Sequence, residues 1–220
     1  MNELVIAIDG PSGSGKSSTS KGVAERLDLD YLDTGSMYRA FTVFGVDQRI
    51  DPDDSAQVSR AIEAIDLVIK TDPRDFRIVL NGEDVTKRLH TPAISGEVSS
   101  FARVQPIRDF LTAKMRQIIE NSGRIVVEGR DITTVVAPDA QIRILLIADP
   151  NERIARRAAQ VADQADLETV KQQVLGRDAA DSKVNEFIKP ADGVTLLDNS
   201  DLTLDEAVAE VIAMVPENLH

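Results

Sequence analysis

The sequence predicts an α/β fold, with helices packed on both faces of a mostly parallel sheet. Continuous apolar runs at 4–8, 124–129 and 142–149 have the length and composition of strands that are buried on both faces. Helical spacing of apolar residues follows these runs, so strand and helix alternate along the chain. With 220 residues, of which 42% are hydrophobic and 28% charged, the chain has the size and composition of one elaborated globular domain over 1–220.

The first elements are a strand at 4–8, a glycine-rich turn and a helix at 16–27. In this helix Val23, Ala24 and Leu27 share one face, which indicates packing against the sheet. The same apolar spacing predicts further helices at 36–46, 105–121, 150–162, 167–177 and 204–215, and a short strand at 194–198.

Between Asp51 and Gly96 the pattern changes. The runs at 64–71 and 76–86 read as short strands, and the second contains an Asn-Gly pair, which is the usual signal for antiparallel pairing. No low-complexity tract or long Gly/Ser linker separates this segment from its surroundings. We therefore expect an inserted subdomain at about 51–100 that contains short antiparallel strands.

Composition restricts the chemistry that the chain can carry out. It has no cysteine and two histidines, so the expected chemistry runs on oxygen ligands, lysine and arginine. A formal net charge of -12 argues against binding of a nucleic acid polymer, which requires a cationic surface. No apolar run is long enough to span a membrane and the N-terminus lacks the features of a signal peptide. We expect a cytoplasmic protein and, since nothing in the sequence demands more, a monomer.

The turn after the first strand contains Gly10, Gly15, Lys16 and Ser17, which match the phosphate-binding motif G-x-x-x-x-G-K-[ST]. Glycines let the backbone curl so that successive N–H groups point at phosphate oxygens, and the following helix adds its positive N-terminal end. The lysine reaches the β- and γ-phosphates, and the serine hydroxyl binds Mg²⁺. A plain connecting turn would not need the complete motif, so we predict a site for a nucleoside triphosphate with Mg²⁺. Its predicted residues are Gly10, Pro11, Ser12, Gly13, Ser14, Gly15, Lys16, Ser17 and Ser18.

This motif alone does not define the reaction, because switches, motors, ATPases and kinases share it. The chain contains neither D-x-x-G nor N/T-K-x-D, the two elements expected of a guanine-nucleotide switch. Its length best fits a kinase for a small molecule. One alternative is a kinase for UMP, AMP or a hydroxyl metabolite, and another is a nucleotide-dependent binding or switch protein without phosphotransfer.

Two segments place acids and arginines at strand ends, where open α/β sheets bind their ligands. YLDTGSMYRA contains Asp33, Thr34, Tyr38 and Arg39, and VVEGRDITTVV contains Glu128, Gly129, Arg130 and Asp131. An arginine grips a phosphate through two hydrogen bonds, and transfer between two anions needs such cations to offset their repulsion. A surface salt bridge is the commoner role for a single arginine. Two such clusters in one phosphate-loop protein nevertheless favour a site for a phosphorylated acceptor.

Three further arginines, Arg153, Arg156 and Arg157, share one helical face by their spacing. They form either a cationic lid over the triphosphate or a solvated helix face, and their spacing favours neither interpretation. The same two interpretations apply to Arg177 and Asp181, four residues apart on the next predicted helix.

With these segments the chain resembles the bacterial cytidylate kinases of the nucleoside monophosphate (NMP) kinase family. The resemblance covers nearly the whole length and rests mainly on LDTGSMYR and EGRDITTVV, because the phosphate loop is generic. It implies a P-loop NTPase-type, five-stranded parallel sheet flanked by helices, an inserted NMP-binding subdomain at 51–100 and a helical lid at 150–190. It also implies transfer of the γ-phosphoryl group of ATP to CMP or dCMP, giving CDP or dCDP and ADP.

The resemblance further implies which residues form the site. The CMP-binding residues would be Thr34, Tyr38, Arg39, Ser99, Arg108, Arg130, Asp131, Arg177 and Asp181. Among them the three arginines at 39, 108 and 130 would clamp the phosphate, and Ser99 and Asp131 would bond the cytosine edge or the arginines. Arg157 would join the ATP side. The catalytic residues would be Lys16, Arg130, Asp131 and Arg177, with no covalent intermediate.

Two positions depart from the family pattern. Thr133 stands where a glycine is usual, and Val184 stands where the lid usually has an arginine. Lys183 is adjacent and could supply a point charge, although a lysine lacks the planar fork of an arginine. The departures therefore affect the expected contribution of the lid and leave the expected reaction unchanged.

Overall fold

A computed structural model describes residues 3–160 and 189–219 of the chain. The chain divides into two compact units. Unit 1 comprises Met1–Leu32 and Ser122–His220, and unit 2 comprises Asp33–Asn121. Each unit has its own sheet.

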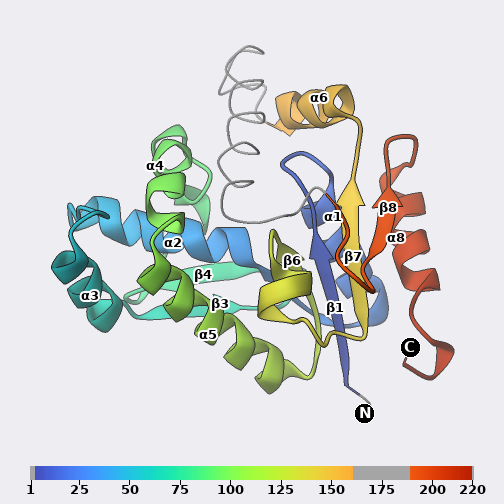
Figure 1. Cartoon of the computed structure of the whole chain (residues 1–220), viewed down its shortest axis with the longest axis horizontal. Helices are drawn as coiled ribbons and strands as arrows, with labels where there is room; N and C mark the ends of the chain where they lie inside the picture. Colours follow the sequence, from blue (N-terminus) through green and yellow to red (C-terminus); the bar gives the residue numbers. More distant parts are fainter. Residues whose placement is uncertain (1–2, 161–188, 220) are drawn as a thin grey trace. The chain divides into compact units, whose positions relative to one another are not determined.

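Unit 1 is built on a five-stranded sheet in the order β2-β6-β1-β7-β8. Its strands are β1 Leu4–Asp9, β2 Asp30–Asp33, β6 Arg124–Gly129, β7 Ile142–Ile147 and β8 Thr195–Asp198. β1 pairs in parallel with both β6 and β7, and β7 pairs in parallel with β8, as Figure 1 shows. The predicted five-stranded parallel sheet is confirmed, and the P-loop strand β1 is its centre.

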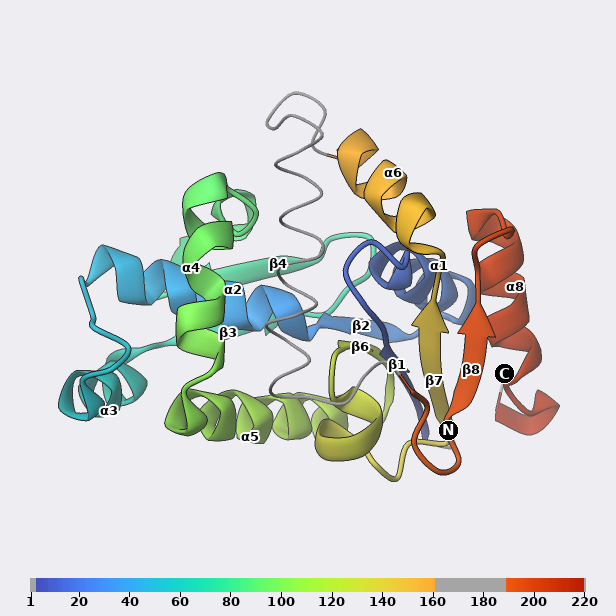
Figure 2. The same ribbon diagram turned by 45° about the horizontal axis from the view of Figure 1, so that its top comes forward.

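Helices flank this sheet. Within the described part of unit 1 the helices are α1 Lys16–Leu27, α6 Pro150–Gln160, α8 Leu204–Ala213, a π-helix η2 Ile132–Val136 and a short 3-10 helix η3 Glu217–Leu219. α1 and α8 lie side by side in both ribbon views (Figures 1 and 2), and a Cβ on Gly22 would come within 2.8 Å of Val208. The side chains of Ile6, Ile8 and Val126 are fully buried, which explains why the central strands read as unbroken apolar runs.

Unit 2 combines four helices with a small antiparallel sheet in the order β3-β4-β5. Its elements are α2 Thr34–Asp47, α3 Ser55–Ala64, β3 Leu67–Lys70, β4 Arg77–Leu80, β5 Glu83–Asp84, the 3-10 helix η1 Thr86–Arg88, α4 Pro92–Ala102 and α5 Gln105–Ser122. Asn81 and Gly82 have φ values of 49° and 83°, the left-handed geometry of a tight hairpin turn. The predicted antiparallel strands are thus confirmed, whereas α3 and α4 were not predicted.

Phenylalanine rings form the centre of unit 2. The ring of Phe41 lies 6.5 Å from that of Phe44, 6.3 Å from that of Phe101 and 6.2 Å from that of Phe110. These separations are in the range of favourable aromatic pairs, so one ring of α2 joins α4 and α5. A Cβ on Gly45 would lie 2.3 Å from Phe101, so any larger residue there would push α2 and α4 apart.

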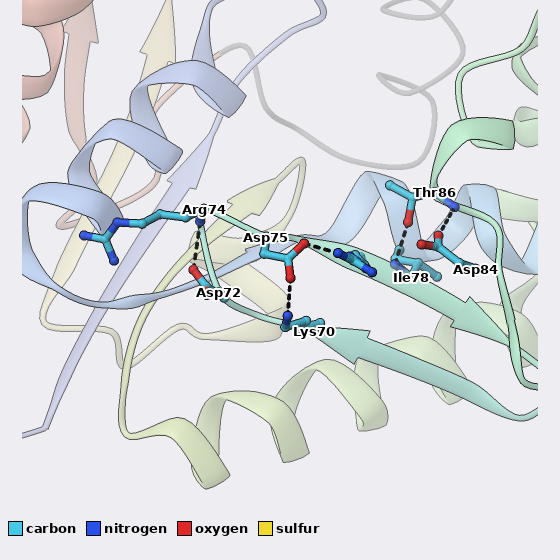
Figure 3. Close-up of polar contacts among 8 residues, drawn as sticks. Lys70, Asp72, Arg74, Asp75, Ile78, Asp84 and Thr86 are labelled. Atoms are coloured by element: carbon cyan, nitrogen blue, oxygen red, sulfur yellow. Dashed lines mark hydrogen bonds and ion pairs between the residues drawn. The ribbon is translucent and has the colours of Figure 1, made fainter.

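The small sheet of unit 2 carries its polar contacts on the surface, as Figure 3 shows. Asp75 pairs with Lys70 and with Arg77, whose Nε lies 2.7 Å from the carboxylate. Thr86 Oγ1 accepts a hydrogen bond of 2.9 Å from the Ile78 N–H, and Asp84 accepts one of 2.9 Å from the Thr86 N–H. These contacts order the hairpin locally.

None of the helices in the two described ranges has the length and apolar character needed to cross a membrane.

Candidate active site

The loop between β1 and α1 adopts a curled shape that requires glycine. Gly13 has a φ of 77°, and a Cβ there would lie 2.6 Å from the Arg153 carbonyl oxygen. At Gly10 a Cβ would lie 2.2 Å from the Leu146 carbonyl oxygen of β7. α1 then begins at Lys16, and its N-cap residue Gly15 has no side chain to cap the first N–H groups. The uncapped helix start is the geometry in which backbone N–H groups bind an anion.

Lys16, the lysine of the motif, lies beside a buried acid. Its Nζ is 3.7 Å from Oε2 of Glu128, a residue at the end of β6 that is 2% exposed. Oε1 of the same carboxylate accepts a hydrogen bond of 3.1 Å from the Tyr31 hydroxyl. The sequence placed Glu128 at a strand end without giving it a role. The signal that could have identified it is an acid within an otherwise apolar strand, close to the carboxyl end of that strand.

The segment after β6 carries two of the predicted catalytic residues. Nη1 of Arg130 donates a hydrogen bond to the Gly10 carbonyl oxygen, so this arginine contacts the phosphate loop directly. Asp131 is 8% exposed, and its carbonyl oxygen accepts from the N–H of Val135 at 2.9 Å and of Val136 at 3.1 Å. The second bond spans five residues and marks the π-helix, a type of helix that is frequent at functional sites.

Two of the three arginines predicted on one helical face contact the phosphate loop region. Nη1 of Arg153 donates to the Ser12 carbonyl oxygen at 3.1 Å, and Arg153 is 8% exposed. Nη1 of Arg156 donates to Oδ1 of Asn199 at 2.9 Å, and its Nη2 donates to the Asn199 carbonyl oxygen, also at 2.9 Å. The interpretation as a solvated helix face is therefore wrong for these two residues. Arg157 lies in α6, and its side chain is outside the described part.

Asn199 is a residue of this region that the sequence did not indicate. It follows β8, is 3% exposed, and its Nδ2 donates to the Ser14 carbonyl oxygen at 2.8 Å. Together with the bonds from Arg156, this amide joins α6, the phosphate loop and the end of β8. No local pattern marks it, because Asn199 and Ser14 are 185 positions apart.

Five predicted acceptor-side residues belong to unit 2. They are Thr34, Tyr38 and Arg39 on α2, Ser99 on α4 and Arg108 on α5. Nη1 of Arg39 donates to the Leu89 carbonyl oxygen at 2.8 Å and to Ser95 Oγ at 3.0 Å, which ties α2 to the start of α4. Nη1 of Arg108 donates to the Ala102 carbonyl oxygen at 3.3 Å.

The remaining predicted site residues cannot be placed. Arg177, Asp181, Lys183 and Val184, together with the predicted helix at 167–177, lie outside the described residues. Within the described ranges, no group of three or more His, Cys, Asp or Glu side chains could hold a metal ion.

The parallel sheet, with its glycine loop between the central strand and a helix, defines the chain as a P-loop nucleotide-binding protein. The family model described as "Cytidylate kinase" matches residues 6–217, and the chain belongs to this family. It is therefore an enzyme of the kinase type, and the family implies that it uses ATP.

Two relatives of the chain carry the same description as the family model. The chain is 52% identical over 221 residues to a cytidylate kinase of Cutibacterium acnes, covering 99% of this chain and 98% of the relative. It is 40% identical over 220 residues to a cytidylate kinase of Rhodococcus jostii, covering 98% and 96%. Among solved structures, an uncharacterized protein from Eubacterium ventriosum has a TM-score of 0.51 at 14% identity, covering 96% of this chain and 97% of that one, which shows the fold alone.

Proposed function

We propose that the enzyme transfers the γ-phosphoryl group of ATP to the phosphate of CMP or dCMP, giving CDP or dCDP and ADP. The observation that carries this proposal is the hydrogen bond from Arg130 to the Gly10 carbonyl oxygen. It brings an arginine suited to an acceptor phosphate against the loop suited to the donor phosphates. Two anions that repel each other can meet only where such cations neutralise them.

On the donor side, the loop from Gly10 to Ser18 binds the triphosphate through backbone N–H groups and the uncapped start of α1. Lys16 neutralises the β- and γ-phosphates, and the ion pair with Glu128 at 3.7 Å keeps its ammonium group near the loop. The Ser17 hydroxyl supplies the protein ligand for Mg²⁺. When bound, Mg²⁺ neutralises charge on the triphosphate oxygens. Arg157 belongs to the same donor side.

On the acceptor side, the residues proposed to bind CMP or dCMP are Thr34, Tyr38, Arg39, Ser99, Arg108, Arg130, Asp131, Arg177 and Asp181. Of these, the arginines at 39, 108 and 130 hold the acceptor phosphate, and Asp131, Arg130, Arg177 and Lys16 act in catalysis. A general base is not required, because the acceptor phosphate is already an anionic nucleophile. Catalysis then depends on position and on charge neutralisation.

We assign the segment 51–100 as the NMP-binding subdomain and the segment 150–190 as the lid. Water in the site would accept the phosphoryl group in place of the substrate. Closure of these two segments on the substrates would exclude this water.

We propose a cytoplasmic monomer that acts on small nucleotides. The net charge of -12 supports this, because it disfavours binding of nucleic acid polymers.

Coupled measurement of ADP formation tests the proposed acceptor. Purified enzyme is given ATP and Mg²⁺ with CMP, dCMP, UMP, AMP or no acceptor. We expect kcat/KM to be highest for CMP or dCMP and ADP release without acceptor to be slow. Preferred use of UMP or AMP would contradict the acceptor assignment, and ATP binding without acceptor-stimulated ADP release would contradict phosphotransfer.

A further inference from the structure

Asp9, the last residue of β1, binds the turn that follows β6. Its side chain is 3% exposed. Oδ1 accepts a hydrogen bond of 2.8 Å from the Ile132 N–H, and Oδ2 accepts one of 2.9 Å from the Thr133 N–H. The Thr133 hydroxyl donates a third bond to Oδ2 at 2.6 Å. A single buried carboxylate thus accepts from the first two residues of the π-helix η2.

These bonds make Asp9 a cap for a helix on another part of the chain. The first N–H groups of any helical segment lack partners within the helix, and an acidic side chain that accepts from them stabilises the helix start. Hydrogen bonds to an ionised carboxylate are stronger than those between neutral groups. The next residue, Gly10, accepts from Arg130. Two consecutive residues at the entrance to the phosphate loop therefore hold both ends of the short segment from Arg130 to Thr133.

Burying the Asp9 carboxylate costs free energy, and the hydrogen bonds to it offset this cost. Burial raises the pKa of Asp9, while the hydrogen bonds from Thr133 and Ile132 lower it and the neighbouring Asp131 raises it further. A buried charge is unfavourable unless hydrogen bonds satisfy it, and here three donors are aimed at one carboxylate. An apolar residue at the end of β1 would avoid the cost of burying the charge but would leave the N–H groups of Ile132 and Thr133 unbound.

We propose that Asp9 and Thr133 are positioning residues, which fix the turn carrying Arg130 and Asp131 against the phosphate loop. The carboxylate sets the direction in which the chain leaves β6, and the Thr133 hydroxyl supplies the third donor. The proposal rests on the proposed function in so far as Arg130 binds the acceptor phosphate.

Replacement of the hydroxyl tests the proposal in a folded protein. Thr133→Val keeps the shape of the side chain and removes the donor, Thr133→Ser keeps the donor, and Thr134→Val alters the exposed neighbour on the same helix. We expect Thr133→Val to lower kcat/KM for CMP about tenfold, the effect of losing one bond to a charged group. KM for ATP should change less than about twofold, because the donor loop is intact. Thr133→Ser and Thr134→Val should resemble the wild type.

A double-mutant cycle with Arg130→Ala separates positioning from general stability. If Thr133 acts through Arg130, Thr133→Val should lower kcat/KM less than about twofold in the Arg130→Ala enzyme. Fully additive losses would overturn the proposal. So would a Thr133→Val enzyme that is destabilised in urea unfolding but has wild-type kinetics.

Amide hydrogen exchange provides a readout that does not depend on the acceptor. In Asp9→Asn, exchange of the Ile132 and Thr133 amides should accelerate at least about tenfold without nucleotide, while the Ile6 amide of β1 stays protected. Unchanged exchange at both amides would overturn the proposal. If Asp9→Asn does not fold, Thr133→Val takes its place, and faster exchange is expected for the backbone amide of position 133. Preference for an acceptor other than CMP or dCMP would contradict the proposed function while leaving this result intact.

Discussion

The surroundings of the phosphate loop in unit 1 and the small sheet of unit 2 use polar side chains in opposite ways. In unit 1, Asp9, Glu128 and Asn199 are each no more than 3% exposed and bind groups far away in the sequence. In the small sheet of unit 2, the side chains of Lys70, Asp75 and Arg77 are between 37% and 53% exposed and bind sequence neighbours. Burying a polar group costs free energy unless it is fully bonded, whereas an exposed ion pair costs and contributes little.

This difference shows where the molecule accepts a cost to fix geometry. These three buried groups of unit 1 lie around the phosphate loop: Asp9 precedes it, Glu128 holds Lys16, and Asn199 binds the Ser14 carbonyl oxygen. The exposed pairs that Asp75 makes with Lys70 and Arg77 order a hairpin of unit 2. Changes around the loop should therefore affect turnover, and changes in the hairpin should not.

The largest effect should follow removal of the loop lysine. Lys16→Ala takes away the cation proposed to neutralise the transferred phosphate, and the loss of one such group lowers kcat by about 10²–10³-fold. Lys21→Ala, on the exposed side of the same helix α1, is the matched control and should retain wild-type turnover. Coupled ADP formation with CMP measures both. Near-wild-type turnover of Lys16→Ala would remove the basis for assigning catalysis to unit 1.

Asn199→Ala should have the next largest effect. It removes the side-chain amide that binds the Ser14 carbonyl oxygen and Nη1 of Arg156, which costs about 1–3 kcal/mol in the free energy of unfolding. Because the loop loses a support, KM for ATP should rise more than KM for CMP. Urea unfolding and steady-state kinetics give the two values. Asn151→Ala on the exposed face of α6 is the control, and an equal change in both variants would contradict a specific role for Asn199.

The buried carboxylate of Asp9 should make stability depend on pH in an unusual direction. Its folded pKa is raised, chiefly by burial, so between the unfolded and the folded pKa the native state binds more protons than the unfolded state. The contribution of Asp9 to stability is therefore complete below its unfolded pKa and is lost as the pH rises through its folded pKa. Subtracting the urea unfolding free energies of Asp9→Asn from those of the wild type should give a difference that falls with pH. A difference that rises with pH would show that hydrogen bonds outweigh burial.

The features that the sequence predicted are those that depend on a few consecutive residues. The loop from Gly10 to Ser17 is contiguous, and Asn81-Gly82 determines its hairpin through local backbone geometry alone. The helices α3 and α4 could have been found, since Asp54 caps α3 by accepting from the Ala56 and Gln57 amides and Pro92 begins α4.

The buried contacts of the site could not be predicted in this way. Asp9 and Thr133 are 124 positions apart, and Asn199 and Ser14 are 185 positions apart. Each pair is created by the order of strands in the sheet, which brings the ends of β1, β6 and β8 into one unit. A residue type at a strand end shows that it can serve a site, whereas its partner is known only once the strand order is known.

The smallest effect is expected from a change in the hairpin of unit 2. The hydrogen bonds from Lys70 and Arg77 lower the pKa of Asp75, so its contribution to stability is present above the unfolded pKa and is lost as the pH falls through the folded one. Because all three side chains are solvated and screened, Asp75→Asn should leave the urea midpoint and kcat at neutral pH unchanged at low and at high salt. A loss of stability as large as that of Asn199→Ala would mean that exposed contacts in the hairpin contribute as much to stability as buried contacts around the phosphate loop. Unchanged stability with reduced turnover would instead place the hairpin in the reaction itself, since only a contact with substrate or a moving segment changes kcat without changing the folded state.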